Sequence, residues 1–137
     1  MAIARRATPA SVGNVSEAIA VLQRALNEFS GSVTESDQSD IFISVRERIH
    51  RLLLDDPDKL ERYRTLQNAQ AEALLRTGDL KRGERLYLLT TAGCDAALRL
   101  AQRQIEDAQF QSAALTLLQL DRHPDRADAR ARAALQL

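Results

Sequence analysis

Apolar residues recur with the period of an α-helix over most of the chain, and short polar breaks separate the periodic stretches. The clearest pattern covers residues 91–124 and predicts two short helices folded back on each other. The apolar positions of its first arm are Ala96, Ala97, Leu100, Ala101 and Ile105. Those of its second arm are Ala113, Ala114, Leu117, Leu118 and Leu120. A bend ending in Phe110 separates the arms, and we expect this ring to close the open end of the hairpin. One hairpin cannot bury both of its faces, so neighbouring helices are required.

The N-terminal part of the chain is less regular. Residues 1–13 show no sustained period, and Pro9 interrupts any helix, so we expect a flexible or truncated segment there. A helix is predicted from about Val15 to Phe29, with Asn14 as its N-cap. Residues 30–42 are polar and rich in serine, which predicts a loop. The rest of the chain, residues 14–137, is interpreted as one domain.

Start and stop signals divide the remaining helices. Ser44-Val45-Arg46-Glu47 is a capping box, and Asp55-Asp56-Pro57 predicts the end of that helix and the start of a long one reaching Arg76. Gly78 is its expected stop, Asp79 caps Leu80–Leu89, and Gly83 indicates close packing. Thr90–Gly93 is expected to be a turn, and a last helix covers Asp125–Leu137. The pattern predicts an all-α stack of antiparallel helical hairpins with about six to seven helices.

Composition supports this class and excludes others. The chain has 137 residues with only 5 Gly and 3 Pro, too few for an all-β chain of tight turns. Its 19 basic residues balance 19 acidic ones, which argues against a nucleic-acid-binding protein. No apolar run approaches the roughly 18 residues of a membrane-spanning helix, so we expect no membrane insertion.

Residues with catalytic or metal-binding chemistry are few. Cys94 is the one cysteine, which excludes an intrachain disulfide and a cysteine zinc site, and we expect it to be a small packed residue. His50 has no second ligand at metal-binding spacing, so a surface or half-buried position is expected. His123 is expected to contact the end of the preceding helix. We therefore expect no cofactor, no metal and no enzyme; the remaining enzymatic alternative would use Cys94 or His50.

Three segments share a local pattern in which a small residue, a polar residue and an apolar residue separate two helices. They are Gly13-Asn14-Val15, Gly78-Asp79-Leu80 and Ala108-Gln109-Phe110. This pattern resembles the inter-helix turn of the tetratricopeptide repeat (TPR), with Gly83 and Ala113 at the small position of its second helix. The resemblance implies a non-catalytic protein-interaction or scaffolding module that binds a protein or peptide. The groove would use polar residues on the first helices, namely Gln67, Gln70, Arg99, Arg103 and Gln104.

A wider resemblance covers about residues 14–125. Ser44-Val45-Arg46, Tyr63-Arg64 and the segment from Thr91 to Leu100 occur in an order similar to that in the N-terminal helical region of large bacterial proteins with a PQQ-like β-propeller. The resemblance implies a domain of a larger protein in the bacterial cell envelope or periplasm; without it, a cytoplasmic location is expected. The alternative function is structural: packing on its own propeller, or a homodimer formed through the apolar C-terminal helix.

Overall fold

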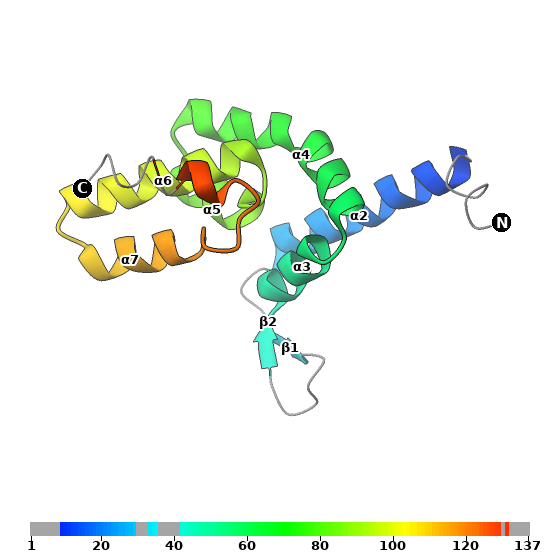
Figure 1. Ribbon diagram of the computed structural model, residues 1–137, viewed down its shortest axis with the longest axis horizontal. Coiled ribbons are helices and arrows are strands. Elements are labelled where there is room, and N and C mark those ends of the chain that lie inside the picture. Colours follow the sequence, from blue (N-terminus) through cyan, green and yellow to red (C-terminus); the bar gives the residue numbers. More distant parts are fainter. Residues whose placement is uncertain (1–8, 30–32, 36–41, 130, 132–137) are drawn as a thin grey trace. The chain divides into compact units, whose positions relative to one another are not determined.

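The computed structural model describes residues 9–29, 33–35, 42–129 and 131. These residues form an all-α fold with one small strand pair (Figure 1). The elements in chain order are α2 (Pro9–Phe29), β1 (Val33–Glu35), β2 (Phe42–Ser44), α3 (Val45–Leu54), α4 (Pro57–Thr77), α5 (Leu80–Tyr87), α6 (Thr91–Glu106) and α7 (Phe110–Leu118). The chain divides into two compact units, residues 1–65 and 66–137, and α4 carries the chain from the first into the second.

Helix α2 begins earlier than the sequence predicts. It starts at Pro9 and continues without a break through Gly13 and Asn14, so Asn14 is not an N-cap and no inter-helix turn exists at Gly13-Asn14-Val15. Proline is compatible with the first turn of a helix, because the amide hydrogen that it lacks would have no partner there. Pro9 therefore begins a helix and does not interrupt one, which corrects that part of the prediction. Residues 1–8 lie outside the described residues.

Part of the predicted loop at residues 30–42 is a strand instead. β1 pairs with β2 in antiparallel register, with Val33 opposite Ser44 and Glu35 opposite Phe42. Both strands contain β-branched or aromatic residues, which favour extended backbone. The serine content of the segment concealed this preference. Residues 30–32 and 36–41 lie outside the described residues.

Helix α3 starts as the capping box predicts. The Ser44 hydroxyl oxygen accepts a hydrogen bond of 3.0 Å from the Glu47 backbone N–H. Ile49 and Leu53 are buried as expected, but His50 is buried as well, which corrects its predicted surface or half-buried position. The reason is its place on the helix, since positions 49, 50 and 53 share one face.

A buried hydrogen bond joins α2 to α4 within the first unit. Tyr63 is only 1% exposed, and its hydroxyl donates to Gln23 Oε1 at 2.7 Å. The Gln23 amide in turn donates to Asn27 Oδ1 at 3.0 Å. Because both polar groups have partners, their burial beside Ile19 and Leu26 does not leave an unsatisfied donor in the core.

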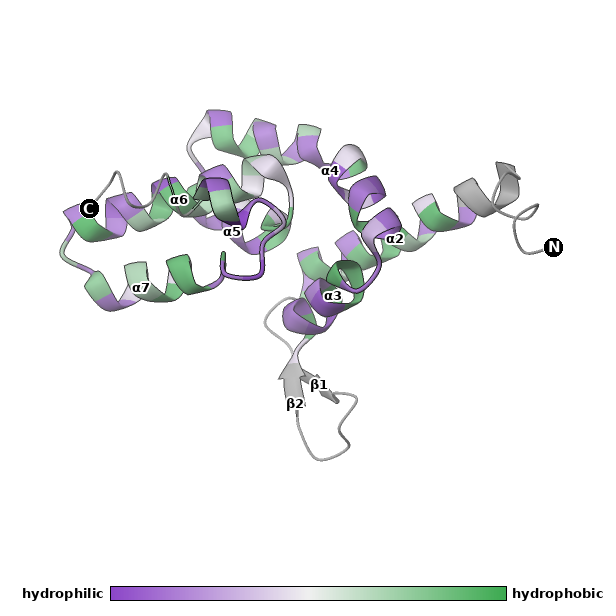
Figure 2. Cartoon of the chain, viewed as in Figure 1, coloured by the Kyte–Doolittle hydropathy of each residue, from purple (hydrophilic) through white to green (hydrophobic). Residues whose placement is uncertain are grey.

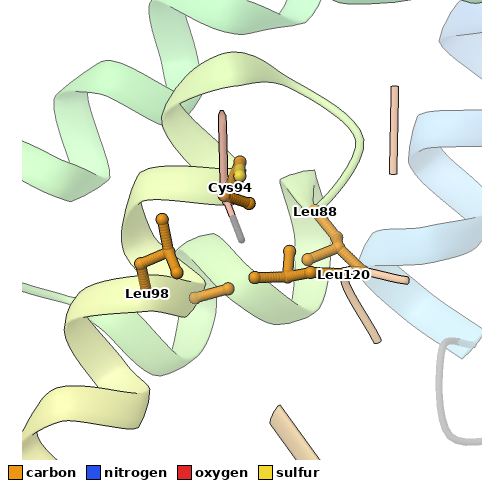
Figure 3. Packing of buried hydrophobic residues seen from close by; sticks show 6 residues of the cluster. Leu88, Cys94, Leu98 and Leu120 are labelled. Carbon is orange, nitrogen blue, oxygen red and sulfur yellow. The ribbon is translucent and has the colours of Figure 1, made fainter. Parts of the chain in front are cut away.

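In the second unit, α5 packs on α6 and α6 packs on α7. One buried cluster joins Ala71 of α4 to the end of α5 and the start of α6. A second cluster surrounds Cys94 with leucine side chains from three parts of the chain (Figure 3). Its labelled members are Leu88, Leu98 and Leu120. Cys94 is 3% exposed, so its predicted role as a small packed residue is confirmed.

The α4–α5 turn and the α6–α7 turn have the same backbone geometry. In the first, Gly78 adopts φ +80°, and the N–H groups of residues 78 and 79 donate to the carbonyls of residues 75 and 74. In the second, Ala108 adopts φ +58°, and residues 108 and 109 donate to residues 105 and 104. Both turns are therefore Schellman-type helix ends with one left-handed residue. The similarity of Gly78-Asp79-Leu80 and Ala108-Gln109-Phe110 in sequence corresponds to a shared structure.

The residue after each turn behaves differently in the two hairpins. Leu80 is 5% exposed and packs with Ala96 and Leu100 of α6. Phe110 is 65% exposed, so the expectation that it closes the α6–α7 hairpin is wrong. Gly83 does provide the predicted close approach, because a Cβ there would lie 3.1 Å from the Ala96 Cβ.

The chain after α7 is attached to the end of α5. His123 is 2% exposed; its Nε2 donates to the Leu88 carbonyl at 2.7 Å, and its Nδ1 accepts from the Asp125 N–H at 3.0 Å. These two bonds define the neutral tautomer protonated on Nε2. Leu88 is the C-cap of α5, so His123 contacts an earlier helix end than the sequence predicts. Of the predicted last helix, residues 130 and 132–137 lie outside the described residues.

Candidate functional site

A pocket of about 250 Å³ lies between the α4–α5 turn and the second half of α6. Its lining combines apolar residues of the turn with polar and charged residues of α6. The lining residues are Leu75, Gly78, Leu80, Arg99, Gln102, Arg103 and Glu106. All of them belong to the second compact unit.

The turn holds the apolar side of the pocket in place. Gly78 ends α4 in the left-handed conformation, and Asp79 starts α5 by accepting a hydrogen bond of 3.3 Å from the Arg82 N–H. This short connection places Leu80 against Leu75 and α6. Leu80 is buried and Leu75 packs against the same cluster, so packing positions the apolar side of the pocket.

The α6 side of the pocket carries an excess of positive charge. Arg99, Gln102, Arg103 and Glu106 follow one another at i, i+3, i+4 and i+7, which places them on one exposed face of the helix. The Gln102 amide donates to Glu106 Oε1 at 3.2 Å. Within the described part of the chain, neither arginine side chain has an ion-pair partner. Two guanidinium groups and one carboxylate therefore border the leucines.

Only some of the predicted groove residues reach this pocket. Arg99 and Arg103 line it, whereas Gln67 and Gln70 lie on α4 outside its lining. Gln104 points its amide oxygen toward α7, where it accepts a hydrogen bond of 2.9 Å from the Thr116 hydroxyl. Gln104 therefore helps to hold the α6–α7 hairpin together and does not belong to the pocket.

Sequence reasoning missed Gln102 and Glu106. Both share the helical face of Arg99 and Arg103, so a helical projection of residues 91–106 would have found them. It also missed Leu75 and Leu80 as pocket residues. Their position at the pocket depends on the fold of the turn, and no local pattern in the sequence predicts that position.

The other candidate residues are built into the cores. Cys94 lies among leucines in the second unit, and His50 is buried on α3 in the first unit. Both ring nitrogens of His123 are engaged in hydrogen bonds. Among the described residues, no group of three or more His, Cys, Asp or Glu side chains could hold a metal ion.

Tyr87 is a buried titratable residue of the second unit, 6% exposed. Burial raises the pKa of its hydroxyl above the ordinary value of 10.0, and the nearby charge of Arg82 acts in the opposite direction. At neutral pH the hydroxyl is therefore protonated. The ring packs with Ala71, Leu86 and Ala92, which makes Tyr87 part of the core between α4, α5 and α6.

None of the helices in the described residues combines the length and the apolar character needed to cross a membrane. Comparisons of the chain with protein-family models, with curated proteins and with solved structures found no match.

Proposed function

We propose that the chain is a non-catalytic, TPR-like protein-interaction module that binds an acidic peptide segment in the pocket between the α4–α5 turn and α6. The observation that carries this proposal is the placement of Arg99 and Arg103 beside Leu75 and Leu80. Guanidinium groups bind carboxylates through paired, charge-assisted hydrogen bonds. Leucines next to them suit an apolar side chain of the same peptide.

The size of the pocket favours a peptide over a small-molecule cofactor. Its volume of about 250 Å³ is below the roughly 300–1,000 Å³ that is typical of small-molecule sites. A pocket of this volume suits one or two side chains of a longer segment. The remaining contacts would come from the surface around it, including Gln67 and Gln70 on α4.

The two matching turns support the TPR-like part of the proposal. A repeated helical hairpin with a shared turn is the unit from which such arrays are built. In this interpretation α4 and α6 are the first helices of successive units, and α5 and α7 are the second helices. The chain would then serve as one domain of a larger protein.

The burial of the nucleophilic and basic side chains supports a non-catalytic role. Cys94 is 3% exposed and surrounded by leucines, so no substrate reaches its thiol without local unfolding. His123 uses both nitrogens in hydrogen bonds that fix the C-terminal segment. A general base needs a free nitrogen within reach of its substrate.

The binding surface is tested by removing its positive charge. Isotope-labelled protein is titrated with a short model peptide of alternating Glu and Leu, and amide chemical shifts are followed by NMR. We expect shifts concentrated on residues 99–106 and on Leu80. In the double variant Arg99→Gln/Arg103→Gln, affinity should fall at least about tenfold, since loss of two charge-assisted contacts costs more than about 1.4 kcal/mol.

The matched control is Lys81→Gln/Arg85→Gln, which removes the same charge from exposed positions of α5 outside the pocket. It should weaken peptide binding less than about threefold, as expected from screened long-range attraction alone. Equal losses in the two double variants, or shifts spread over the whole chain, would discard the pocket as the binding site.

A further inference from the structure

Helix α7 is apolar on two opposite faces. Ala113 and Thr116 are buried against the rest of the second unit, and Leu117 packs on the cluster around Cys94. On the other side, Phe110, Leu115 and Leu118 are 65%, 63% and 66% exposed. Three large apolar side chains on the outside of one nine-residue helix are unusual for a surface that meets only water.

The outer face of α7 also lacks charge. Residues 109–120 contain no Asp, Glu, Lys or Arg, although such residues make up 28% of the chain. In Figure 2, α7 is drawn mostly in the hydrophobic colour, whereas α4 alternates between the two colours. Depletion of charge together with exposed aromatic and aliphatic residues is the composition found at the centre of protein interfaces.

The first hairpin indicates what kind of surface suits this face. Leu80 and Leu88 occupy the positions relative to α5 that Phe110 and Leu118 occupy in α7. Leu80 is covered by Ala96 and Leu100 of α6, and Leu88 packs in the cluster with Cys94 and Leu98 of the same helix. The corresponding face of α5 is thus buried by an apolar helix that carries small residues at the contact.

We propose that the outer face of α7 is a self-association surface, on which α7 of a second copy packs antiparallel about a two-fold axis. Phe110, Ala114 and Leu118 recur every four residues and so form a single strip along the helix. In the two-fold pair, Phe110 of one copy meets Leu118 of the other, and the two Ala114 residues meet at the axis. A small residue there allows the helix axes to approach closely.

A second copy fits this strip better than an unrelated partner for two reasons. A two-fold interface requires the surface to complement itself, and a strip with a small residue between two large ones does so when it is reversed. The chain also has a formal net charge of zero at neutral pH, so two copies do not repel each other as they approach. An uncharged strip offers no electrostatic selection for a charged partner.

Cysteine cross-linking tests the two-fold geometry directly. Ala114→Cys places a thiol at the proposed axis, whereas Ser112→Cys places an exposed thiol elsewhere on α7. The native Cys94 is buried, so the unsubstituted protein is the background control. Under mild oxidation we expect Ala114→Cys to form disulfide-linked dimers at least about tenfold faster than Ser112→Cys.

Sedimentation equilibrium provides a second test of dimerisation. The full chain should show a monomer–dimer equilibrium, and Ala114→Glu should raise the dimer dissociation constant at least about tenfold, with an unchanged circular dichroism spectrum. A full chain that stays monomeric at millimolar concentration would overturn the proposal. So would equal cross-linking rates for the two cysteine variants, or dimers that persist unchanged in Ala114→Glu.

Discussion

A Cβ atom at Gly93 would overlap the Tyr87 carbonyl group and lie 2.9 Å from the Leu88 Cα. Gly93 sits in the first turn of α6, where its N–H donates to the Thr90 hydroxyl oxygen at 2.9 Å. The same hydroxyl donates to the Tyr87 carbonyl at 2.7 Å. The start of α6 is therefore held so close to the end of α5 that the backbone leaves no room for a side chain.

Gly93→Ala should lower the free energy of unfolding by more than about 3 kcal/mol, because a backbone segment and not a flexible side chain must move. Urea titration followed by circular dichroism measures the loss. Gly83→Ala is the control, since its Cβ would meet only the Ala96 Cβ at 3.1 Å. There we expect a change within about 1 kcal/mol, as the gain in helix propensity opposes the tight contact. Equal effects of the two substitutions would contradict the close α5–α6 approach at Gly93.

The sequence predicts some of these residues and not others. It indicates that Gly83 allows close packing, because glycine destabilises the interior of a helix and its presence there suggests a packing requirement. It assigns Gly93 to a turn, because Thr90 and Gly93 together are typical of one. The constraint on Gly93 comes from the carbonyl of Tyr87, and no local pattern reports how closely two backbones approach. The exposure of Phe110 depends on what packs around the α6–α7 turn, and no local pattern reports that either.

At the level of elements, three helix ends with a local signal follow the prediction, whereas the signal at Asn14 does not mark the start of α2. Ser44 caps α3, Asp79 caps α5 and Gly78 ends α4, and each depends on residues three to five positions away. The start of α2 and the β1–β2 pair deviate, since neither Pro9 nor the serine-rich segment specifies one outcome locally. The hydrogen bond from His123 to the Leu88 carbonyl spans distant parts of the chain, so spacing alone cannot reveal it.

The two Schellman-type turns allow a reciprocal test of the cost of left-handed backbone. At φ +58° the Cβ of Ala108 destabilises the left-handed backbone, whereas Gly78 at φ +80° has no Cβ. A Cβ added at Gly78 would have no other atom within 4 Å, so only the backbone conformation opposes it. Ala108→Gly should stabilise the chain by about 1 kcal/mol, and Gly78→Ala should destabilise it by about 1–2 kcal/mol. The double variant should come close to the unsubstituted protein in a urea titration. Two changes of the same sign would show that contacts outside the turns dominate.

For the whole molecule, periodicity predicts the number and class of helices but not how they are grouped. The sequence indicates one domain over residues 14–137, and the apolar pattern of α4 continues across Thr65 and Leu66, between which the two compact units divide. A helix that passes from one unit into the next has no composition change to mark the boundary. The apolar half of the candidate site could not be predicted from the sequence either, because the pocket combines α6 with a turn from another part of the chain.

The two proposed surfaces differ in charge, and this gives the last prediction. Arg99 and Arg103 attract an acidic segment, whereas the α7 strip is uncharged on a chain of zero net charge. Raising NaCl from about 50 to 500 mM shortens the screening length roughly threefold. Affinity for the Glu-Leu model peptide should therefore fall at least about fivefold, while the dimer dissociation constant changes less than about twofold. Fluorescence titration and sedimentation equilibrium on the same samples measure both. If dimerisation weakened with salt as much as peptide binding did, charged residues outside α7 would have to form the contact between copies.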